Sequence, residues 1–238
     1  MSTPPSISDG TLADKAFEWL EEAIIRGEFV PGSKLDEARL AAAFCISRGP
    51  VREAIRRLEG KKLVERIAHS GVRVVQTKPE DLDELLVIRE VLEGLACRLA
   101  TKKMSDSALK QLGDLLNAHA NDEGLQAGAD YYQRPGDYDF HFRIIQESGN
   151  RRLIETLCDD LYHQLRLHRY RSGSKAGRPL KALQEHRQIL QAMQSRDAEK
   201  AATLMRKHIE QARKQSSKVI TKIELDLVNA SNQEKESD

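Results

Sequence analysis

The feature that most constrains the fold is a pair of short helical patterns joined by only three residues, Cys45-Ile46-Ser47. The first pattern covers residues 36–44. The second begins at Ser47, a favourable N-cap, and has Pro50 in its first turn, where the missing N–H of proline costs nothing. Its apolar residues recur at the i, i+3, i+4, i+7 spacing of one helix face: Val51, Ala54, Ile55 and Leu58. Two helices joined so tightly predict a helix-turn-helix.

The charge of the chain is unevenly distributed. The 38 basic and 37 acidic residues nearly cancel, with a formal net charge of +1, yet residues 47–76 hold eight basic and three acidic side chains. A local positive cluster indicates an anionic partner, although a solvated helix face would produce the same count. Because arginines on the outer face of the second helix can pair bidentately with guanine edges, the pattern favours DNA.

The flanking residues complete a small domain. Apolar residues from Leu12 to Ile24 recur at helical spacing and stop at Gly27, and residues 29–33 read as a turn. Downstream, residues 63–67 and 72–76 alternate in polarity around His69-Ser70-Gly71, which predicts two strands and a turn, a wing beside the helix.

The stretch Arg39–Glu59, RLAAAFCISRGPVREAIRRLE, resembles the winged helix of the GntR transcription factors, and the match continues to the wing tip at Gly71. The resemblance implies that arginines of both helices meet operator bases or phosphates and that the wing reaches the minor groove. The residues expected at the DNA are Arg39, Ser47, Arg48, Gly49, Arg52, Arg56, His69 and Gly71. Lys61-Lys62-Leu63 departs from the family, which usually has glycine there, so we expect a strained or altered turn before the wing.

The rest of the chain shows helical patterns and no strand pattern. Six helices are expected, beginning near residues 79, 105, 137, 153, 180 and 197, the last reaching about residue 229. The predicted fold class is therefore mainly α. A winged helix-turn-helix over residues 1–76 precedes an antiparallel all-helical bundle over residues 77–230, and residues 231–238 form a disordered polar tail.

Four polar residues of the bundle point to a metal site. Asp137 and His141 are spaced i, i+4 and should share a helix face, and His186 and His208 lie on the apolar faces of two other helices. One carboxylate and three imidazoles suit a first-row divalent ion with open coordination positions. The alternative is that each histidine is a hydrogen-bonded residue of the core or its boundary.

The same segments resemble the FadR-type subgroup of GntR regulators, whose C-terminal domain is the FCD domain. The resemblance rests on DYDFH (137–141), SGN (148–150), EHRQIL (185–190) and MRKH (205–208). It implies that Asp137, His141, His186 and His208 hold one divalent metal per subunit, with zinc the first expectation and nickel or manganese the alternatives. Arg89 corresponds to an arginine that often faces the ligand cavity in relatives, although an i, i+4 pair with Glu93 explains it equally well.

Taken together, these features predict a cytoplasmic homodimer that binds a palindromic operator and is released by a small carboxylate-bearing effector beside the metal. His168 is a second candidate for lining the effector cavity. No membrane partner is expected, because no apolar run is long enough to span a bilayer and the start of the chain is polar. No catalytic residues are expected. Two alternatives stay open: a metalloenzyme tethered to DNA, with Asp139 or Glu185 near the metal, and a pure metal sensor.

Overall fold

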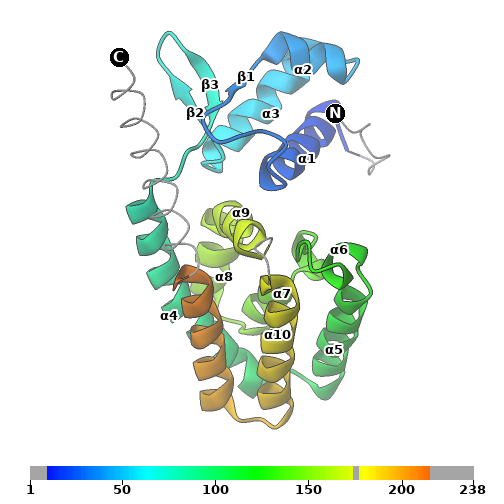
Figure 1. Cartoon of the computed structure of the whole chain (residues 1–238), viewed down its shortest axis with the longest axis vertical. Coiled ribbons are helices and arrows are strands. Elements are labelled where there is room, and N and C mark those ends of the chain that lie inside the picture. Colours follow the sequence, from blue (N-terminus) through cyan, green and yellow to red (C-terminus); the bar gives the residue numbers. More distant parts are fainter. Residues whose placement is uncertain (1–9, 174–176, 215–238) are drawn as a thin grey trace, which may run out of the picture. The chain divides into compact units, whose positions relative to one another are not determined.

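The computed structural model describes residues 10–173 and 177–214, which divide into two compact units. The first unit contains the described residues up to Gln76 together with Asp159–Arg171. The second contains Thr77–Cys158 and the described chain from residue 177 onward. Each unit is described separately below, and Figure 1 labels the elements of both.

Three helices form the body of the first unit: α1 (Leu12–Ile25), α2 (Glu37–Ala43) and α3 (Arg48–Gly60). The Thr11 hydroxyl and the Asp14 carboxylate close a capping box at the start of α1. The Asp36 side chain caps α2, and Ser47 occupies the N-cap position of α3. The tight connection between α2 and α3 and the wing described next confirm the predicted winged helix-turn-helix.

The sheet of this unit has three strands, β1 (Lys34–Leu35), β2 (Val64–Ile67) and β3 (Gly71–Val74), in the order β1-β3-β2 and all antiparallel (Figure 1). The strand β1 was not predicted, because residues 29–33 read only as a turn. It forms because that turn, with Gly32 at φ +80°, returns the chain to β3, where Gly32 and Ser33 exchange backbone hydrogen bonds with Val74.

The core of the first unit lies between α1 and α3. Leu20 and Ile24 of α1 are fully buried, as are the predicted stripe residues of α3: Val51, Ala54, Ile55 and Leu58. One basic residue of α3 also faces α1, because Arg57 bonds Asp14 at 2.6 Å and its guanidinium lies 4.3 Å from the centroid of the Phe17 ring. Arg57 therefore links the two helices.

The second unit is a helical bundle, which confirms the predicted fold class. Its helices are α4 (Pro79–Lys103), α5 (Asp106–Ala120), α6 (Glu123–Gln126), α7 (Phe140–Glu147), α8 (Arg151–Ile154), α10 (Arg178–Gln194) and a last helix over residues 198–214. The apolar faces of α5, α7, α10 and the last helix share one core, which includes Leu112, Leu116, Ile144, Ile189, Met193 and Met205. The last helix runs antiparallel to α4, since Glu199 pairs with Arg98 and Arg213 with Asp83.

Two predicted helices differ from the structure. The helix expected from Asp137 begins at Phe140, because Gly136 takes φ +66° and residues 136–138 form a separate 3-10 turn, η1 (Gly136–Tyr138). The helix expected over residues 153–171 is interrupted by a π-helical turn, η2 (Glu155–Asp160), and resumes as α9 (Tyr162–Gly173). The shifted start of α7 matters for the site described below.

The α9 segment packs with the first unit. Residues 159–171 group with that unit by their contacts, and the predicted domain bounds, which place them in the C-terminal domain, stay a prediction. Ionic contacts with α1 hold them there: His163 with Glu21, and Arg166 with Glu22 at 2.9 Å. Such long-range pairs are invisible to helical periodicity. The predicted extension of the last helix to residue 229 and the predicted tail lie outside the described residues.

No helix within residues 10–173 and 177–214 is long and apolar enough to cross a membrane.

Candidate nucleic-acid interface and metal centre

The outer face of α2 and α3 carries the residues predicted to meet DNA. Arg39, Ser47, Arg48, Gly49, Arg52 and Arg56 are all exposed. The side chains of Arg52 and Arg56 are 67% and 74% exposed, and among the described residues they pair with Glu37 at 3.2 Å and Glu53 at 2.7 Å. Exposed ion pairs of this kind are worth little, so phosphates or base edges can displace them. The face is therefore available to an anionic partner.

The wing shows the backbone conformations that its sequence requires. His69 is exposed at φ +61°, and Gly71 takes φ +86° where β3 begins. Lys62 takes φ +56°, in the left-handed region that favours glycine. The strained turn expected at Lys61-Lys62-Leu63 is therefore present.

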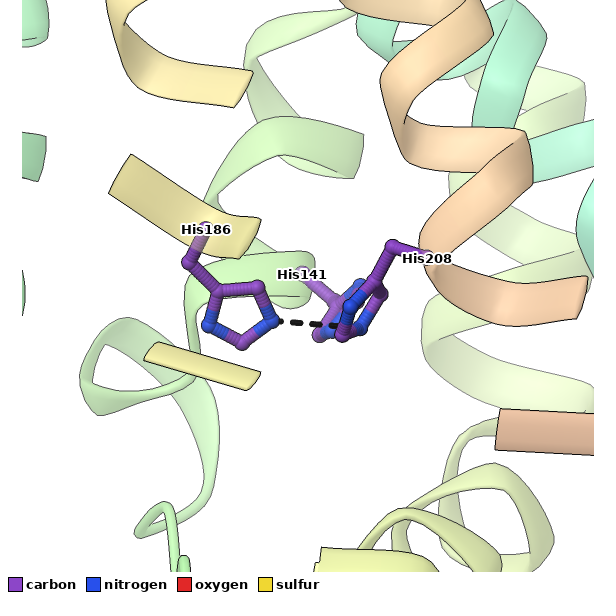
Figure 2. A group of neighbouring side chains, drawn as sticks. All are labelled: His141, His186 and His208. Atoms are coloured by element: carbon purple, nitrogen blue, oxygen red, sulfur yellow. Dashed lines mark hydrogen bonds between the residues drawn. The ribbon is translucent and has the colours of Figure 1, made fainter. Parts of the chain in front are cut away.

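Three of the four predicted metal-binding residues lie together in the second unit. His141 comes from α7, His186 from α10 and His208 from the last helix, and one ring nitrogen of each lies within 4.8 Å of the others. Figure 2 shows the three rings pointing toward one another, with 3.2 Å between the Nε2 atoms of His186 and His208. All three side chains are buried. The fold thus brings together imidazoles that are far apart in sequence.

The Nδ1 atom of each ring has a partner behind it. The Nδ1 of His141 lies 2.6 Å from Glu93 Oε2, the Nδ1 of His208 lies 2.6 Å from Glu185 Oε2, and the Nδ1 of His186 lies 3.1 Å from the Tyr131 hydroxyl. A carboxylate can only accept, so the first two rings donate from Nδ1–H. Their Nε2 atoms then carry the lone pair that can bind a cation, the arrangement typical of metal-bound histidines.

Burial keeps the imidazoles of His186 and His208 neutral. It is the main cause that lowers the pKa of His186 well below the ordinary value and the pKa of His208 to about 4. Behind His208, burial raises the pKa of the Glu185 carboxyl, but its bond to His208 and the nearby Arg178 guanidinium outweigh burial and leave it lowered. Near neutral pH these rings can therefore ligate a metal without first losing a proton.

Asp137 does not lie where the sequence predicted. The expected i, i+4 clamp with His141 is wrong, because Asp137 is exposed in η1 and precedes the start of α7. The buried carboxylate nearby is Asp139, which is 1% exposed and accepts hydrogen bonds from the backbone N–H groups of His141 and Phe142 as the N-cap of α7. A ligand role for Asp137 stays a prediction.

The two predicted effector residues have different surroundings. Arg89 is 1% exposed and bonds Glu93 at 2.7 Å, which confirms the i, i+4 pair. The other carboxylate oxygen of Glu93 accepts from His141, so Arg89 is connected to the histidine cluster through Glu93. His168 is buried on α9, which belongs to the first unit. The effector roles of both residues stay predictions.

Sequence reasoning gave no supporting role to several residues behind the histidines. Tyr131 lies in a loop and His119 on α5, so no spacing marks them and the tertiary fold brings them in. Arg178 is the first residue of α10, two helical turns before Glu185. Glu185 was named only as a neighbour of the metal, although its position directly before His186 was a usable signal. Arg178 bonds Glu185 at 2.8 Å and lies 3.2 Å from the Nδ1 of His208.

Comparisons with known proteins agree with both units. Residues 12–74 match the model of bacterial regulatory proteins of the gntR family, and residues 84–211 match the FCD domain. The chain is 30% identical to the HTH-type transcriptional regulator YdhC of Bacillus subtilis, over 78% of this chain and 82% of that protein. It is 27% identical to the galactonate operon transcriptional repressor of Escherichia coli, over 81% of this chain and 92% of that protein.

Among solved structures, Escherichia coli McbR/YncC has the same fold. The match has a TM-score of 0.68 at 21% sequence identity and covers 89% of this chain and 99% of that one.

Proposed function

This chain belongs to the GntR family of bacterial regulatory proteins and carries its FCD domain, and from that premise we propose a homodimeric repressor whose operator binding is relieved by a small carboxylate held at a metal. The family identifies a DNA-binding transcriptional regulator and not an enzyme, so the DNA-tethered metalloenzyme considered above is set aside. The metal, effector and dimer are the parts of the proposal that need an experiment.

The metal proposal is carried by one observation: three buried imidazoles converge, and hydrogen-bond acceptors hold their Nδ1 atoms. Glu93 and Glu185 each accept from an Nδ1–H, which turns an Nε2 lone pair of His141 and of His208 toward the centre. A divalent ion relieves the repulsion between such lone pairs. Three imidazole ligands fit zinc, at Zn–N distances near 2.0–2.1 Å, and also suit nickel, with manganese a weaker alternative. We propose one ion per subunit.

Charge balance favours an anionic effector at that ion. The buried charged side chains nearby are Arg89, Arg178, Glu93 and Asp139, and Glu185 is 12% exposed on its side chain. Two positive and three negative groups leave one negative charge, so a divalent ion brings the buried site to a net positive charge of one. Uncompensated buried charge is costly, and a single carboxylate cancels it.

A three-histidine site also leaves an open coordination position for that carboxylate. The galactonate operon repressor, a relative of this chain, is named for a sugar acid, which is itself a carboxylate. An effector changes regulation only if it binds the DNA-competent and DNA-incompetent arrangements with different affinity. We propose release from DNA because several relatives are named repressors.

The proposed homodimer is supported by an apolar stripe on α4. Val87, Ile88, Val91 and Leu95 are 37–59% exposed and lie on one helix face at successive turns. A contiguous exposed apolar face of this kind marks an interaction site. We propose that a second copy of this chain covers the stripe, and the charges at its two ends support that choice.

The charges at the ends of the stripe give the pairing a direction. Glu80, Asp81 and Glu84 are exposed at the N-terminal end of α4, and Arg98, Lys102 and Lys103 are exposed at the C-terminal end. Antiparallel packing of two α4 helices about a two-fold axis at Val91 places each acidic end against a basic end, whereas parallel packing opposes like charges. We therefore propose an antiparallel α4 pair.

The experiment measures metal content first and DNA binding second. Protein purified without chelator or metal-affinity resin is reconstituted with Zn²⁺, Ni²⁺ or Mn²⁺ and analysed by elemental analysis. We expect about one ion per chain for the wild type and a loss of it for His208→Ala. His69→Ala is the matched control, since His69 is exposed in the wing. A wild type that takes up none of these metals would overturn the metal proposal.

Operator DNA selected from a random duplex pool then tests regulation. Metal-loaded protein is titrated with the selected duplex in the presence of a panel of hydroxycarboxylates, at one salt concentration. We expect a palindromic site and weaker binding with at least one acid. Binding that depends on the metal and on no acid would instead identify the pure metal sensor.

A further inference from the structure

Behind His186 lies a run of hydrogen bonds that none of the predicted site residues accounts for. The Nδ1 of His186 lies 3.1 Å from the Tyr131 hydroxyl, which lies 3.0 Å from the Nδ1 of His119. The Nε2 of His119 lies 3.0 Å from the backbone carbonyl oxygen of Tyr138. The run therefore links a buried ring of the histidine cluster to the backbone of η1, and its proton positions can be deduced.

The backbone carbonyl oxygen of Tyr138 can only accept a hydrogen bond. The Nε2 of His119 must therefore be the N–H that donates to Tyr138 O. Burial lowers the pKa of His119, so the ring is neutral near pH 7 and its Nδ1 is an acceptor. The Tyr131 hydroxyl has one proton and donates it to that Nδ1. Its oxygen must then accept from His186, which places the His186 proton on Nδ1.

We infer that His119 and Tyr131 are positioning residues that hold His186 in its Nδ1–H tautomer and so turn its Nε2 lone pair toward His141 and His208. The inference rests on the proposed metal site. Glu93 and Glu185 accept from the Nδ1–H groups of His141 and His208, which leaves the Nε2 atoms of those rings for the metal. In the inference, the Tyr131 hydroxyl is the corresponding acceptor for His186. A neutral hydroxyl does this for His186 where carboxylates do it for the other rings.

Ring packing holds the same orientation. The ring of His186 stacks on Phe140 at a centroid distance of 4.3 Å and an interplanar angle of 22°. Tyr131 lies at 5.4 Å from it on centroids, and His119 packs edge-on against Tyr131 at 5.6 Å. A flip of the His186 ring would place a C–H group against the Tyr131 hydroxyl and lose the hydrogen bond. Packing and hydrogen bonding therefore select one orientation together.

Without this support the other tautomer becomes favourable in the metal-free protein. The Nε2 atoms of His186 and His208 are 3.2 Å apart, and the His208 Nε2 is an acceptor because its Nδ1–H donates to Glu185. A proton on the His186 Nε2 would make a hydrogen bond to His208 and block the metal position. Tyr131 and His119 thus determine whether the Nε2 of His186 carries a lone pair that can bind a cation or a proton that blocks the metal position.

The test uses two readouts on the full-length protein. Long-range ¹H–¹⁵N spectra of histidine-labelled, metal-free protein report which ring nitrogen carries the proton, and competition with a chromophoric chelator reports the affinity for Zn²⁺. We expect the wild type to show His186 as Nδ1–H. Tyr131→Phe keeps the ring and removes the hydroxyl, and we expect it to shift His186 toward Nε2–H and weaken Zn²⁺ binding about 10–100-fold.

The controls separate positioning from folding. Tyr138→Phe is the same substitution at an exposed side chain whose backbone carbonyl is retained, and it should change neither readout. His119→Leu should act like Tyr131→Phe, while His119→Asn, whose amide oxygen can accept from Tyr131, should recover part of the affinity.

A wild-type His186 protonated on Nε2, or a Tyr131→Phe protein with unchanged tautomer and affinity, would overturn the inference. If the wild type binds no metal but shows the deduced tautomer, the positioning role stands and the proposed metal function fails.

Discussion

At the scale of single residues, the arginines of α3 illustrate how local packing assigns roles to similar side chains. Arg57 bonds Asp14 and covers the Phe17 ring, and the Thr11 hydroxyl together with Arg57 lowers the pKa of Asp14 to about 2. Arg52 is on the exposed side of the helix and has only a weak pair with Glu37. The same residue type is structural at one position and available to DNA at the other.

We predict that Arg52→Ala weakens binding to the selected operator by about 1–3 kcal/mol, because one bidentate base contact is lost. Titration of operator and scrambled duplexes at one salt concentration measures the change. Arg151→Ala is the control, since its side chain is 85% exposed on α8 of the second unit. Equal weakening on both duplexes would make Arg52 a phosphate contact, and no change would remove it from the interface.

The three cysteines provide a second prediction at this scale. Cys45 is exposed, whereas Cys97 and Cys158 are buried, and burial raises the pKa of the Cys97 thiol to about 12. Because the thiolate is the reactive form, Cys97 should stay unreactive in the folded protein even when the pH is raised to about 9. A chromogenic disulfide reagent should titrate one fast thiol per chain, and Cys45→Ser should abolish that phase. Two fast thiols in the wild type would contradict the buried positions.

At the scale of elements, the end of α3 shows how a backbone position can conflict with its residue. The N–H groups of Lys62 and Leu63 bond the carbonyls of Glu59 and Leu58, each at 3.0 Å, which is the hydrogen-bond pattern of a Schellman motif. That motif needs a residue with positive φ, and Lys62 takes φ +56° there. Because the connection leads directly to β2, its conformation sets where the wing starts.

We predict that Lys62→Gly stabilises the protein by about 0.5–1 kcal/mol, because the side chain is exposed and glycine removes the cost of the left-handed conformation. A melting temperature higher by about 1–4 °C would follow for a chain of this size. The matched control is Lys61→Gly, since Lys61 takes φ −90° and glycine there should destabilise. Equal shifts for both variants would contradict strain at Lys62.

At the scale of the whole molecule, the proposed function depends on two copies acting together. In the proposed dimer each winged helix reads one half-site, and a two-fold dimer matches a palindromic operator. The charge ordering along α4 allows that dimer to form by antiparallel pairing, with the two copies of Val91 facing each other at the axis. The proposed dimer therefore depends on the exposed apolar stripe of α4.

We predict that Val91→Asp dissociates the dimer at micromolar concentration, because two carboxylates would face each other across the axis. Light scattering of the full chain measures the mass. The matched control is Val30→Asp, which makes the same change at a side chain that is 65% exposed in the turn before β1 of the first unit. A dimeric Val91→Asp protein with wild-type mass would place the interface on another surface.

The sequence alone determined the winged helix and the helical character of the rest. Apolar periodicity places Val51, Ala54, Ile55 and Leu58 on one face of α3, and the same periodicity selects which arginines face outward. The three histidines could also be proposed from their helix faces and from the family motifs. These features depend on interactions between residues a few positions apart, which a linear pattern records directly.

Tertiary structure alone decided which distant side chains contact those residues. Asp137 lost its expected place beside His141 because Gly136 turns the backbone and Asp139 caps α7. Tyr131 and His119 joined the cluster, and α9 joined the first unit through its ion pairs with α1. Each outcome depends on contacts between segments distant in sequence. Helical spacing says which face a residue occupies but carries no information about which distant side chain will meet it.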